Sequence, residues 1–324
     1  MLIRWAKNKM KNYIAELVSA EVRKTTKDMV PLIKQLVDFS NSPKEERQSY
    51  HDGTKNPYGN INLYASLRNR LEASGVSVKE VEIDIPDFER WLVDFPEIKM
   101  NYQGIGEAFI EKCLEHYLAY RYLNISRDDV YIDIAAAGSP WTDILNERVI
   151  QSYRLDLTYP PGVHGSNIGG DAGDSKLQVG FASVLSAQCA FECFMGNADI
   201  RFIREADRIL DARGRYGIVP LYLDDTYFVA TSPYCNQQDV IIESEAKKVW
   251  RDDEYKVPFS RHYSPKSFTK RIYSIIPESM KGKVLYFKNL PDVMDRYKGQ
   301  RIYCFFMFYC EKLIHNSSNH PKGI

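Results

Sequence analysis

Three acidic side chains stand near the ends of predicted strands, where turns of small residues follow. Asp133 lies in the apolar run Val130–Ile134, ahead of the turn AAAGSPW, while Asp156 lies in YRLDL and Asp171 in GGDAG. In a parallel sheet such turns meet at one edge, and small residues let backbone N–H groups approach a bound ligand. An acid about 20 residues after the first turn can accept hydrogen bonds from a ribose diol. The spacing therefore predicts a site for a ligand that contains a nucleoside.

Alternating strands and helices must hold these turns in place. Apolar runs predict strands over Val130–Ile134, Tyr153–Leu157, Ile168–Ala172, Ala182–Gln188, Tyr216–Leu223, Lys283–Phe287 and Ile302–Phe308. Helices are predicted over Ile105–Leu123, about 142–150, Asp199–Leu210 and about 265–276. This alternation favours an α/β fold with a mostly parallel sheet and helices on both faces. Because the segment Lys288–Arg301 is too short for a crossover with a full helix, we expect the last strand to be antiparallel.

The rest of the chain divides into an extension, a lead-in segment and an insertion. Residues 1–60 are predicted to form a basic amphipathic helix over 1–39 and a linker, followed by the lead-in over 61–104. The main domain is expected over 105–318, with a polar, irregular insertion at about 224–260. The basic helix could contact an anionic membrane surface, but packing on a partner subunit or on its own domain is favoured. Within the lead-in, a helix is predicted over Leu63–Ser74, a strand over Val78–Ile85 and a second helix over Asp87–Phe95.

Charge and cysteine usage exclude several classes of protein. The 43 basic and 43 acidic residues balance, which argues against a dedicated nucleic-acid binder. The six cysteines show neither a CxxC pair nor a Cys/His spacing for zinc, so no metal site is predicted. No apolar run approaches the roughly 18–20 residues that span a bilayer, and the first ten residues lack the apolar core of a signal peptide. We expect a cytoplasmic location, with peripheral contact to the inner membrane as the alternative.

The motifs resemble those of the class I S-adenosylmethionine-dependent methyltransferases. DIAAAGSPW is similar to the first motif of that family, Asp-x-Gly-x-Gly-x-Gly, and Asp156 to the acid that closes its second strand. Gly170-Asp171-Ala172 resembles the Gly-Asp-Ala near the adenine, and the segment from Phe202 to Leu223 the helix, turn and fifth strand. The resemblance runs from about Gly104 to Leu313 and implies a Rossmann-like, doubly wound, seven-stranded sheet with an antiparallel last strand. More narrowly, TYPPGVHGSNIGGDA, IVPLYL and FSRHYS resemble methyltransferases of bacterial surface-polysaccharide gene clusters.

The resemblance implies an O-methyltransferase that uses S-adenosylmethionine and modifies a glycan or sugar-nucleotide precursor in surface-polysaccharide biosynthesis. The candidate cofactor-binding residues are Asp133, Ala135, Ala137, Gly138, Trp141, Asp156, Leu157, Asp171, Ala172 and Gln188. The candidate catalytic residues are His164, His262 and Glu192. A histidine with near-neutral titration suits a general base for an acceptor hydroxyl. Arg261, beside His262, could bind a phosphate or a sugar acid.

Several residues keep other interpretations open. Ala135 and Ala137 stand where the family has glycine, and their methyl groups narrow the backbone approach and disfavour a positive φ. Cys193 follows Glu192 where related enzymes have histidine, so a non-catalytic, methyltransferase-like subunit that binds a partner is the alternative. Asp171 could instead make an Asx turn, and Trp141 could simply pack.

Two other enzyme classes are less favoured. In a glycosyltransferase, Asp224 with Asp225 and Asp252 with Asp253 would be ligands of a metal-diphosphate, but the pairs lack the Asp-x-Asp spacing. An oxidoreductase is disfavoured because the sequence has no G-x-G-x-x-G.

Overall fold

The computed structural model describes residues 27, 29–43, 46–48, 60–235, 240–251 and 257–313. Most of the helix predicted over 1–39 lies outside these residues, as do Asp252 and Asp253. Residues 29–39 are helical, as expected, and the helix continues to residue 41, into the predicted linker. The predicted linker over 40–60 contains a short strand, β1 (Arg47–Gln48).

The large sheet has eight described strands in the order β2-β11-β12-β7-β6-β3-β4-β5. In that order they are Val78–Val81, Met280–Phe287, Phe306–Lys312, Leu210–Val219, Ala182–Gln188, Val130–Ile134, Gln151–His164 and Asn167–Gly169. β3 pairs parallel with β4 and β6, whereas β12 is antiparallel to β7 and β11. The Rossmann-like sheet with an antiparallel last strand is therefore confirmed. β2 adds an eighth strand beyond the seven expected, because it pairs parallel with β11 at the edge.

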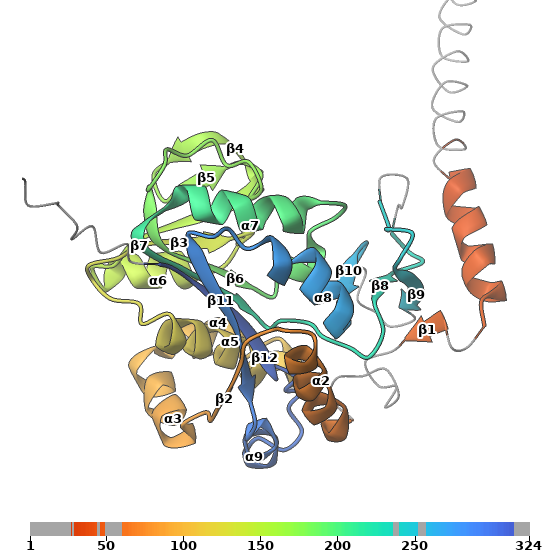
Figure 1. The fold of residues 1–324 in the computed structure, drawn as a ribbon, viewed down its shortest axis with the longest axis horizontal. Coiled ribbons are helices and arrows are strands. Elements are labelled where there is room, and N and C mark those ends of the chain that lie inside the picture. The colour runs from red at the N-terminus through yellow and green to blue at the C-terminus, as the bar shows by residue number, and fades with distance from the viewer. Residues whose placement is uncertain are drawn as a thin grey trace, which may run out of the picture.

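Helices cover both faces of this sheet. They are α2 (Ile61–Ala73), α3 (Ile85–Asp94), α4 (Pro96–Tyr102), α5 (Phe109–Tyr122), α6 (Trp141–Glu147), α7 (Ala198–Ile209), α8 (Pro265–Arg271) and α9 (Leu290–Arg296). Short 3-10 turns are η2 (Gly106–Ala108), η3 (Phe191–Cys193) and η4 (Tyr273–Ile275). Figure 1 shows α3, α4 and α5 on one side of the sheet and α7 and α8 on the other. The polar side chain of Asp84 caps α3, and Ser264 with Ser267 forms a capping box on α8.

One hydrophobic core joins the lead-in segment to the sheet. Leu67 of α2, Phe88 of α3, Ile132 of β3, Phe202 of α7 and Phe308 of β12 are all fully buried in the same cluster. Burying a side chain of this size contributes about 1.5–3 kcal/mol. The lead-in therefore packs into the same core as the strands that carry the candidate site.

β4 runs well beyond its predicted end at Leu157. Its first part pairs with β5 in parallel, and after a register shift Val163 lies opposite Ile168 and His164 opposite Asn167. The chain comes so close to β5 that a Cβ on Gly169 would lie 1.9 Å from the carbonyl oxygen of Pro160. Only glycine fits at this position, and the β4 extension is therefore held tightly over β5.

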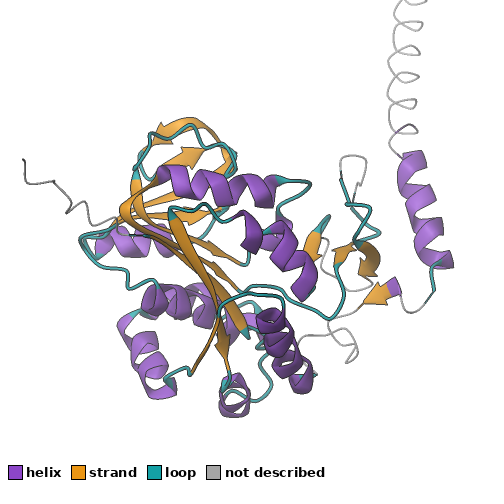
Figure 2. Cartoon of the chain, viewed as in Figure 1, coloured by secondary structure: helices purple, strands orange, loops and turns teal. Residues whose placement is uncertain are grey.

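The insertion is more regular than its sequence predicts. It contains β8 (Phe228–Thr231), β9 (Lys247–Arg251) and β10 (Ser260–His262). Together with β1 these strands form a second sheet in the order β1-β9-β8-β10. These strands have three to five residues, too short for a clear apolar period, and Phe228, Ala230 and Val249 form a small core of their own. Figure 2 shows this sheet on the flank of the body, with the helix over 29–41 beyond it.

Candidate functional site

The turn between β3 and α6 lies at the carboxyl edge of the sheet. Ala135 N–H donates to the Leu155 carbonyl at 2.7 Å, and Asp133 accepts a 2.9 Å hydrogen bond from the Ser139 hydroxyl. Gly138 has φ +77°, and Ala135 has φ +54°. Ala135 thus adopts the left-handed conformation that its methyl group disfavours, whereas Ala137 does not. Asp133 thus orders the turn through its hydrogen bond with Ser139.

Two cavities adjoin at Ala135. The first, called the β3 cavity, has a volume of about 280 Å³ and is lined by Tyr102, Lys112, Glu115, His116, Asp133, Ala135, Ala136, Ala137, Gly138, Ser139, Gln188 and Cys189. The second, called the β4 cavity, has a volume of about 250 Å³ and is lined by Ala135, Leu155, Asp156, Leu157, Gly170, Asp171, Ala172, Cys193, Phe194, Met195, Ala198 and Arg201. A single elongated ligand could therefore reach both cavities across the β3–α6 turn.

The structure brings almost all the predicted cofactor-binding residues to these cavities. Asp133, Ala135, Ala137, Gly138 and Gln188 line the β3 cavity, and Ala135, Asp156, Leu157, Asp171 and Ala172 line the β4 cavity. Trp141 lines neither cavity. It is fully buried and packs beside Phe95 and His116, with ring centroids 5.5 and 5.2 Å away.

The β3 cavity is built from buried ionisable groups. Lys112 Nζ lies 2.9 and 3.0 Å from the two carboxylate oxygens of Glu115. Burial raises the pKa of Glu115 to about 7 and that of Asp133 to about 7, because a charged carboxylate loses its hydration there. Burial lowers the pKa of His116 to about 3, so that ring is neutral, with Nε2 3.0 Å from the Tyr102 hydroxyl.

The two acids of the β4 cavity are held by hydrogen bonds. Asp156 accepts from the N–H of Ala137 at 3.1 Å and from the N–H and hydroxyl of Thr158 at 2.9 and 2.8 Å. Asp171 accepts from Gly173 N–H at 2.8 Å, which is an Asx turn, and its other oxygen pairs with Arg201 at 2.8 Å. A carboxylate has about four lone-pair sites, so Asp156 retains capacity for a ligand hydroxyl.

None of the three candidate catalytic residues lines either cavity. His164 lies exposed on the β4 extension, with Nε2 3.0 Å from the Pro161 carbonyl oxygen. His262 is buried on β10 and stacks on Phe228 at 4.4 Å. Burial lowers the pKa of His262 to about 3, so the near-neutral titration expected for it is wrong.

Glu192, the third candidate, lies in η3 after the end of β6. It is 7% exposed, and burial raises its pKa above the usual range. Its Oε2 is buried without a hydrogen-bond partner among the described residues. Cys189, three residues earlier, lines the β3 cavity.

Sequence reasoning missed the residues that α5 contributes. Lys112, Glu115 and His116 lie three and four positions apart and line the β3 cavity on the helix that leads into β3. Three polar residues on one face of a helix usually face solvent. The signal available was their position directly before the first strand, on a helix already rich in apolar residues.

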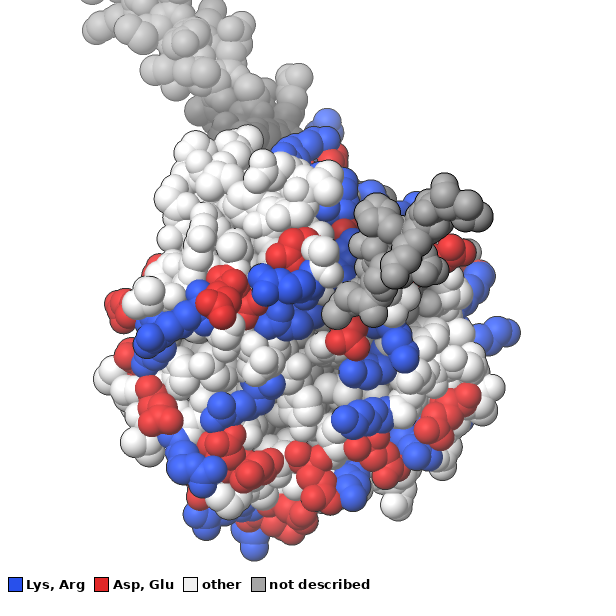
Figure 3. Space-filling model, turned by 60° about the vertical axis from the view of Figure 1, so that its left-hand side comes forward, with Lys and Arg blue, Asp and Glu red and all other residues white. Residues whose placement is uncertain are grey.

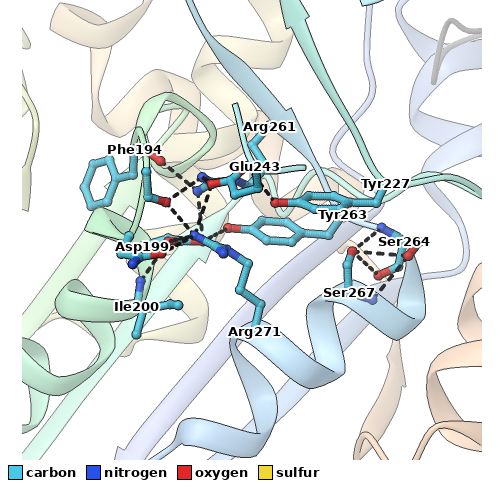
Figure 4. Close-up of polar contacts among 12 residues, drawn as sticks. Phe194, Asp199, Ile200, Tyr227, Glu243, Arg261, Tyr263, Ser264, Ser267 and Arg271 are labelled. Carbon is cyan, nitrogen blue, oxygen red and sulfur yellow. Dashed lines mark hydrogen bonds and ion pairs between the residues drawn. The ribbon is translucent and has the colours of Figure 1, made fainter. Parts of the chain in front are cut away.

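Arg261 is not placed to bind a phosphate or a sugar acid. Its side chain is fully buried, and its guanidinium donates to the carbonyls of Phe194 at 2.7 Å and Gly196 at 2.8 Å. It also forms ion pairs with Asp199 at 2.8 Å and with Glu243 (Figure 4). These partners occupy both terminal nitrogens of the guanidinium, and its Nε is buried without a partner among the described residues.

Three further properties of the molecule concern its surface charge, possible metal ligands and apolar helices. Figure 3 shows basic and acidic side chains intermingled on one face of the molecule. Among the described residues, no three His, Cys, Asp or Glu side chains gather as a metal site would require. No helix in the same part of the chain has the length and apolar character needed to cross a bilayer.

Comparisons with known proteins give distant structural likeness only. No family model and no curated protein matches the sequence. Similar structures include a 1,6-didemethyltoxoflavin-N1-methyltransferase from Burkholderia thailandensis, with 10% identity and a TM-score of 0.40 over 74% of this chain and 95% of that one. They also include an S-adenosylmethionine-dependent methyltransferase from Mesorhizobium loti, with 13% identity, a TM-score of 0.41, and 61% and 98% of the two chains covered. The CcbJ methyltransferase from Streptomyces caelestis has 9% identity and a TM-score of 0.38, with 62% and 90% covered. Likeness this distant assigns no activity, so the function has to be argued from the chain's own residues.

Proposed function

We propose that the protein is an S-adenosylmethionine-dependent methyltransferase. The observation that carries this proposal is the pair of cavities that adjoin at Ala135, one lined by ionic groups and one by apolar side chains with two acids. S-adenosylmethionine has the matching halves, a zwitterionic amino-acid end and a nucleoside. The site also lies at the carboxyl edge of a doubly wound sheet, beside β3. The strands that follow β3 in the chain lie on both sides of it, β4 on one and β6 on the other. Folds of this kind bind ligands at such a point.

The residues present fit this cofactor. In the β3 cavity, the Lys112 ammonium would pair with the carboxylate of the amino-acid end. In the β4 cavity, Asp156 would accept from the ribose diol, while Asp171 and Ala172 would lie near the adenine. When bound, the cofactor supplies an electrophilic methyl group on a sulfonium. The chain's contribution is then to hold the acceptor in line with that methyl group.

We further propose that the acceptor is a hydroxyl of a glycan or a sugar nucleotide. The resemblance of TYPPGVHGSNIGGDA, IVPLYL and FSRHYS to polysaccharide-cluster methyltransferases supports this substrate class. Glu192 is the proposed proton acceptor, because it is buried, has a raised pKa and follows the strand end that reaches the β3 cavity. The Glu192→Gln variant should keep cofactor affinity and lose methyl transfer, measured with tritiated S-adenosylmethionine and sugar-nucleotide acceptors.

Calorimetric titration with S-adenosylhomocysteine tests the cofactor assignment, with NAD as the matched control. Binding of S-adenosylhomocysteine alone is expected, and its absence at millimolar ligand overturns the proposal. Asp156→Ala should weaken binding roughly tenfold, because a hydrogen bond to a charged group is lost. Asp174→Ala is the control, since that carboxylate is exposed and pairs only with the exposed Lys176 among the described side chains. Equal affinities of the two variants would refute the ribose assignment.

A non-catalytic, partner-binding subunit is the second candidate. The helix over 29–41 exposes Met29, Val30, Ile33 and Val37, each more than half accessible, on one side. Such a row favours contact with a partner subunit or a membrane surface. This candidate expects S-adenosylhomocysteine binding without methyl transfer, together with a shift in oligomeric state or vesicle binding that Ile33→Glu abolishes.

A further inference from the structure

One wall of the β4 cavity is a short loop between η3 and α7. Phe194 and Met195 line the cavity from this loop, Cys193 lines it from the end of η3, and Ala198 lines it from the start of α7. Gly196 lies within it at φ +55°, so the loop makes a tight turn there. The shape of the cavity thus depends on how residues 193–198 are held.

Two arginines from distant parts of the chain hold this loop by its carbonyl groups. Arg261 of β10 donates to the Phe194 and Gly196 carbonyls at 2.7 and 2.8 Å. Arg271 of α8 also donates to the Gly196 carbonyl, and to the Asn197 side chain at 3.2 Å. Figure 4 shows the side chains of Arg261 and Arg271 meeting beside Phe194 and Asp199.

The positive charges of these arginines are balanced by two acids, one buried and one partly exposed. Asp199, fully buried at the start of α7, pairs with Arg261 and Arg271 at 2.8 Å and accepts from the Tyr263 hydroxyl at 2.7 Å. Glu243 belongs to the insertion, pairs with Arg261 and, at 3.2 Å, with Arg271. The Tyr227 hydroxyl donates to Glu243 at 3.1 Å. A buried guanidinium that loses one acid keeps its charge and must rearrange to find other partners.

We infer that the insertion sets the adenosine half of the cofactor site, with Glu243 and Arg261 as positioning residues for the wall 193–198. The inference rests on the proposed cofactor. Neither residue lines the β3 or the β4 cavity, so Arg261 acts through the carbonyls of Phe194 and Gly196, and Glu243 acts through Arg261. The β3 cavity shares no lining residue with that loop. The effect of these residues must therefore fall on the adenosine half alone.

Two ligands of different length separate this role from general stabilisation. S-adenosylhomocysteine would fill both cavities, whereas 5′-methylthioadenosine lacks the amino-acid end and would fill the β4 cavity. In the full-length Glu243→Gln variant, calorimetry should show the affinity for both ligands falling by the same factor, roughly tenfold. Asp133→Asn, in the β3 cavity, should weaken S-adenosylhomocysteine alone. Glu245→Gln is the matched control, because Glu245 lies two residues away in an exposed pair with Lys270 and should change neither affinity.

Each outcome decides the inference. If the wild-type protein binds neither ligand, the proposed function fails and this inference fails with it. If the wild type binds both and Glu243→Gln leaves both affinities unchanged, only the positioning role is wrong. Should Glu243→Gln not fold, Tyr227→Phe removes one hydrogen bond to Glu243 and should give a smaller loss of the same kind for both ligands. Faster amide hydrogen exchange over 193–198 in either variant is expected without any ligand, and unchanged exchange would contradict the role.

Discussion

The two cavities differ in what holds their acidic groups. In the β3 cavity Glu115 and Asp133 are 1% and 2% exposed, and burial raises the pKa of both to about 7. In the β4 cavity Asp156 and Asp171 remain partly exposed, and backbone N–H groups and Arg201 bind them. The first cavity therefore depends on charge balance around buried carboxyl groups, and the second on the shape of loops. Substitutions in the β3 cavity should change the free energy of unfolding and the charge of the ligand that binds. Substitutions in the β4 cavity should change chiefly the affinity for the ligand.

Lys112 is the cation of the β3 cavity, and its removal should have a large effect on stability. Lys112→Met leaves Glu115 buried without its ion-pair partner, so the free energy of unfolding should fall by about 3 kcal/mol. Lys176→Met, which removes an exposed pair with Asp174, should cost less than about 0.5 kcal/mol. Urea denaturation measures both. Equal losses would show that the β3 cavity has no special dependence on charge.

A second test uses pH. Since the pKa of Asp133 is raised in the folded state, this group contributes stability at low pH that is lost as pH rises from about 4 through about 7. Asp133→Asn does not titrate, so its unfolding free energy relative to wild type should rise by about 2 kcal/mol between pH 5 and pH 7. Denaturation curves at several pH values give the difference. If the free energies of unfolding of the variant and the wild type change with pH in the same way, other groups cause the pH dependence.

A third test compares the two alanines of the β3–α6 turn, where the cavities adjoin. Glycine at position 135 relieves the left-handed conformation of Ala135, whereas glycine at position 137 only adds freedom to the unfolded chain. Ala135→Gly should therefore be more stable than Ala137→Gly by about 1 kcal/mol. Thermal unfolding of the pair checks the order, and a reversed order would mean that Ala135 carries no strain.

Local sequence signals predicted the strands at the centre of the sheet and the turns that follow them. Val130–Ile134 and Ala182–Gln188 coincide with β3 and β6, because buried parallel strands read as continuous apolar runs. β7 and β12 overlap their predictions but are shifted by several residues, since the apolar runs do not coincide with the paired segments. The acids could be found from the same runs, because Asp133 and Asp156 lie within β3 and β4 and Asp171 comes two residues after β5.

The parts that were not predicted depend on contacts between distant segments. Lys112 and Glu115 look like solvent-facing residues until α5 is packed against the sheet. Arg261, which pairs with Glu243, meets Asp199 only after the insertion folds onto α7, and no local spacing in the sequence predicts that contact. Trp141 and His262 have types that suit a site, but packing placed both in buried aromatic clusters.

β2, the strand that the lead-in adds to the large sheet, affects how the protein behaves in concentrated solution. The described part of the large sheet ends in β2 on one side and in β5 on the other, with four and three residues. Edge strands this short offer few unpaired N–H and C=O groups to a strand of another molecule, and β2 carries the exposed Lys79 and Glu80 as well. Without the lead-in, the eight-residue β11 would be the edge. The segment that precedes the candidate site in sequence thus protects the sheet against aggregation.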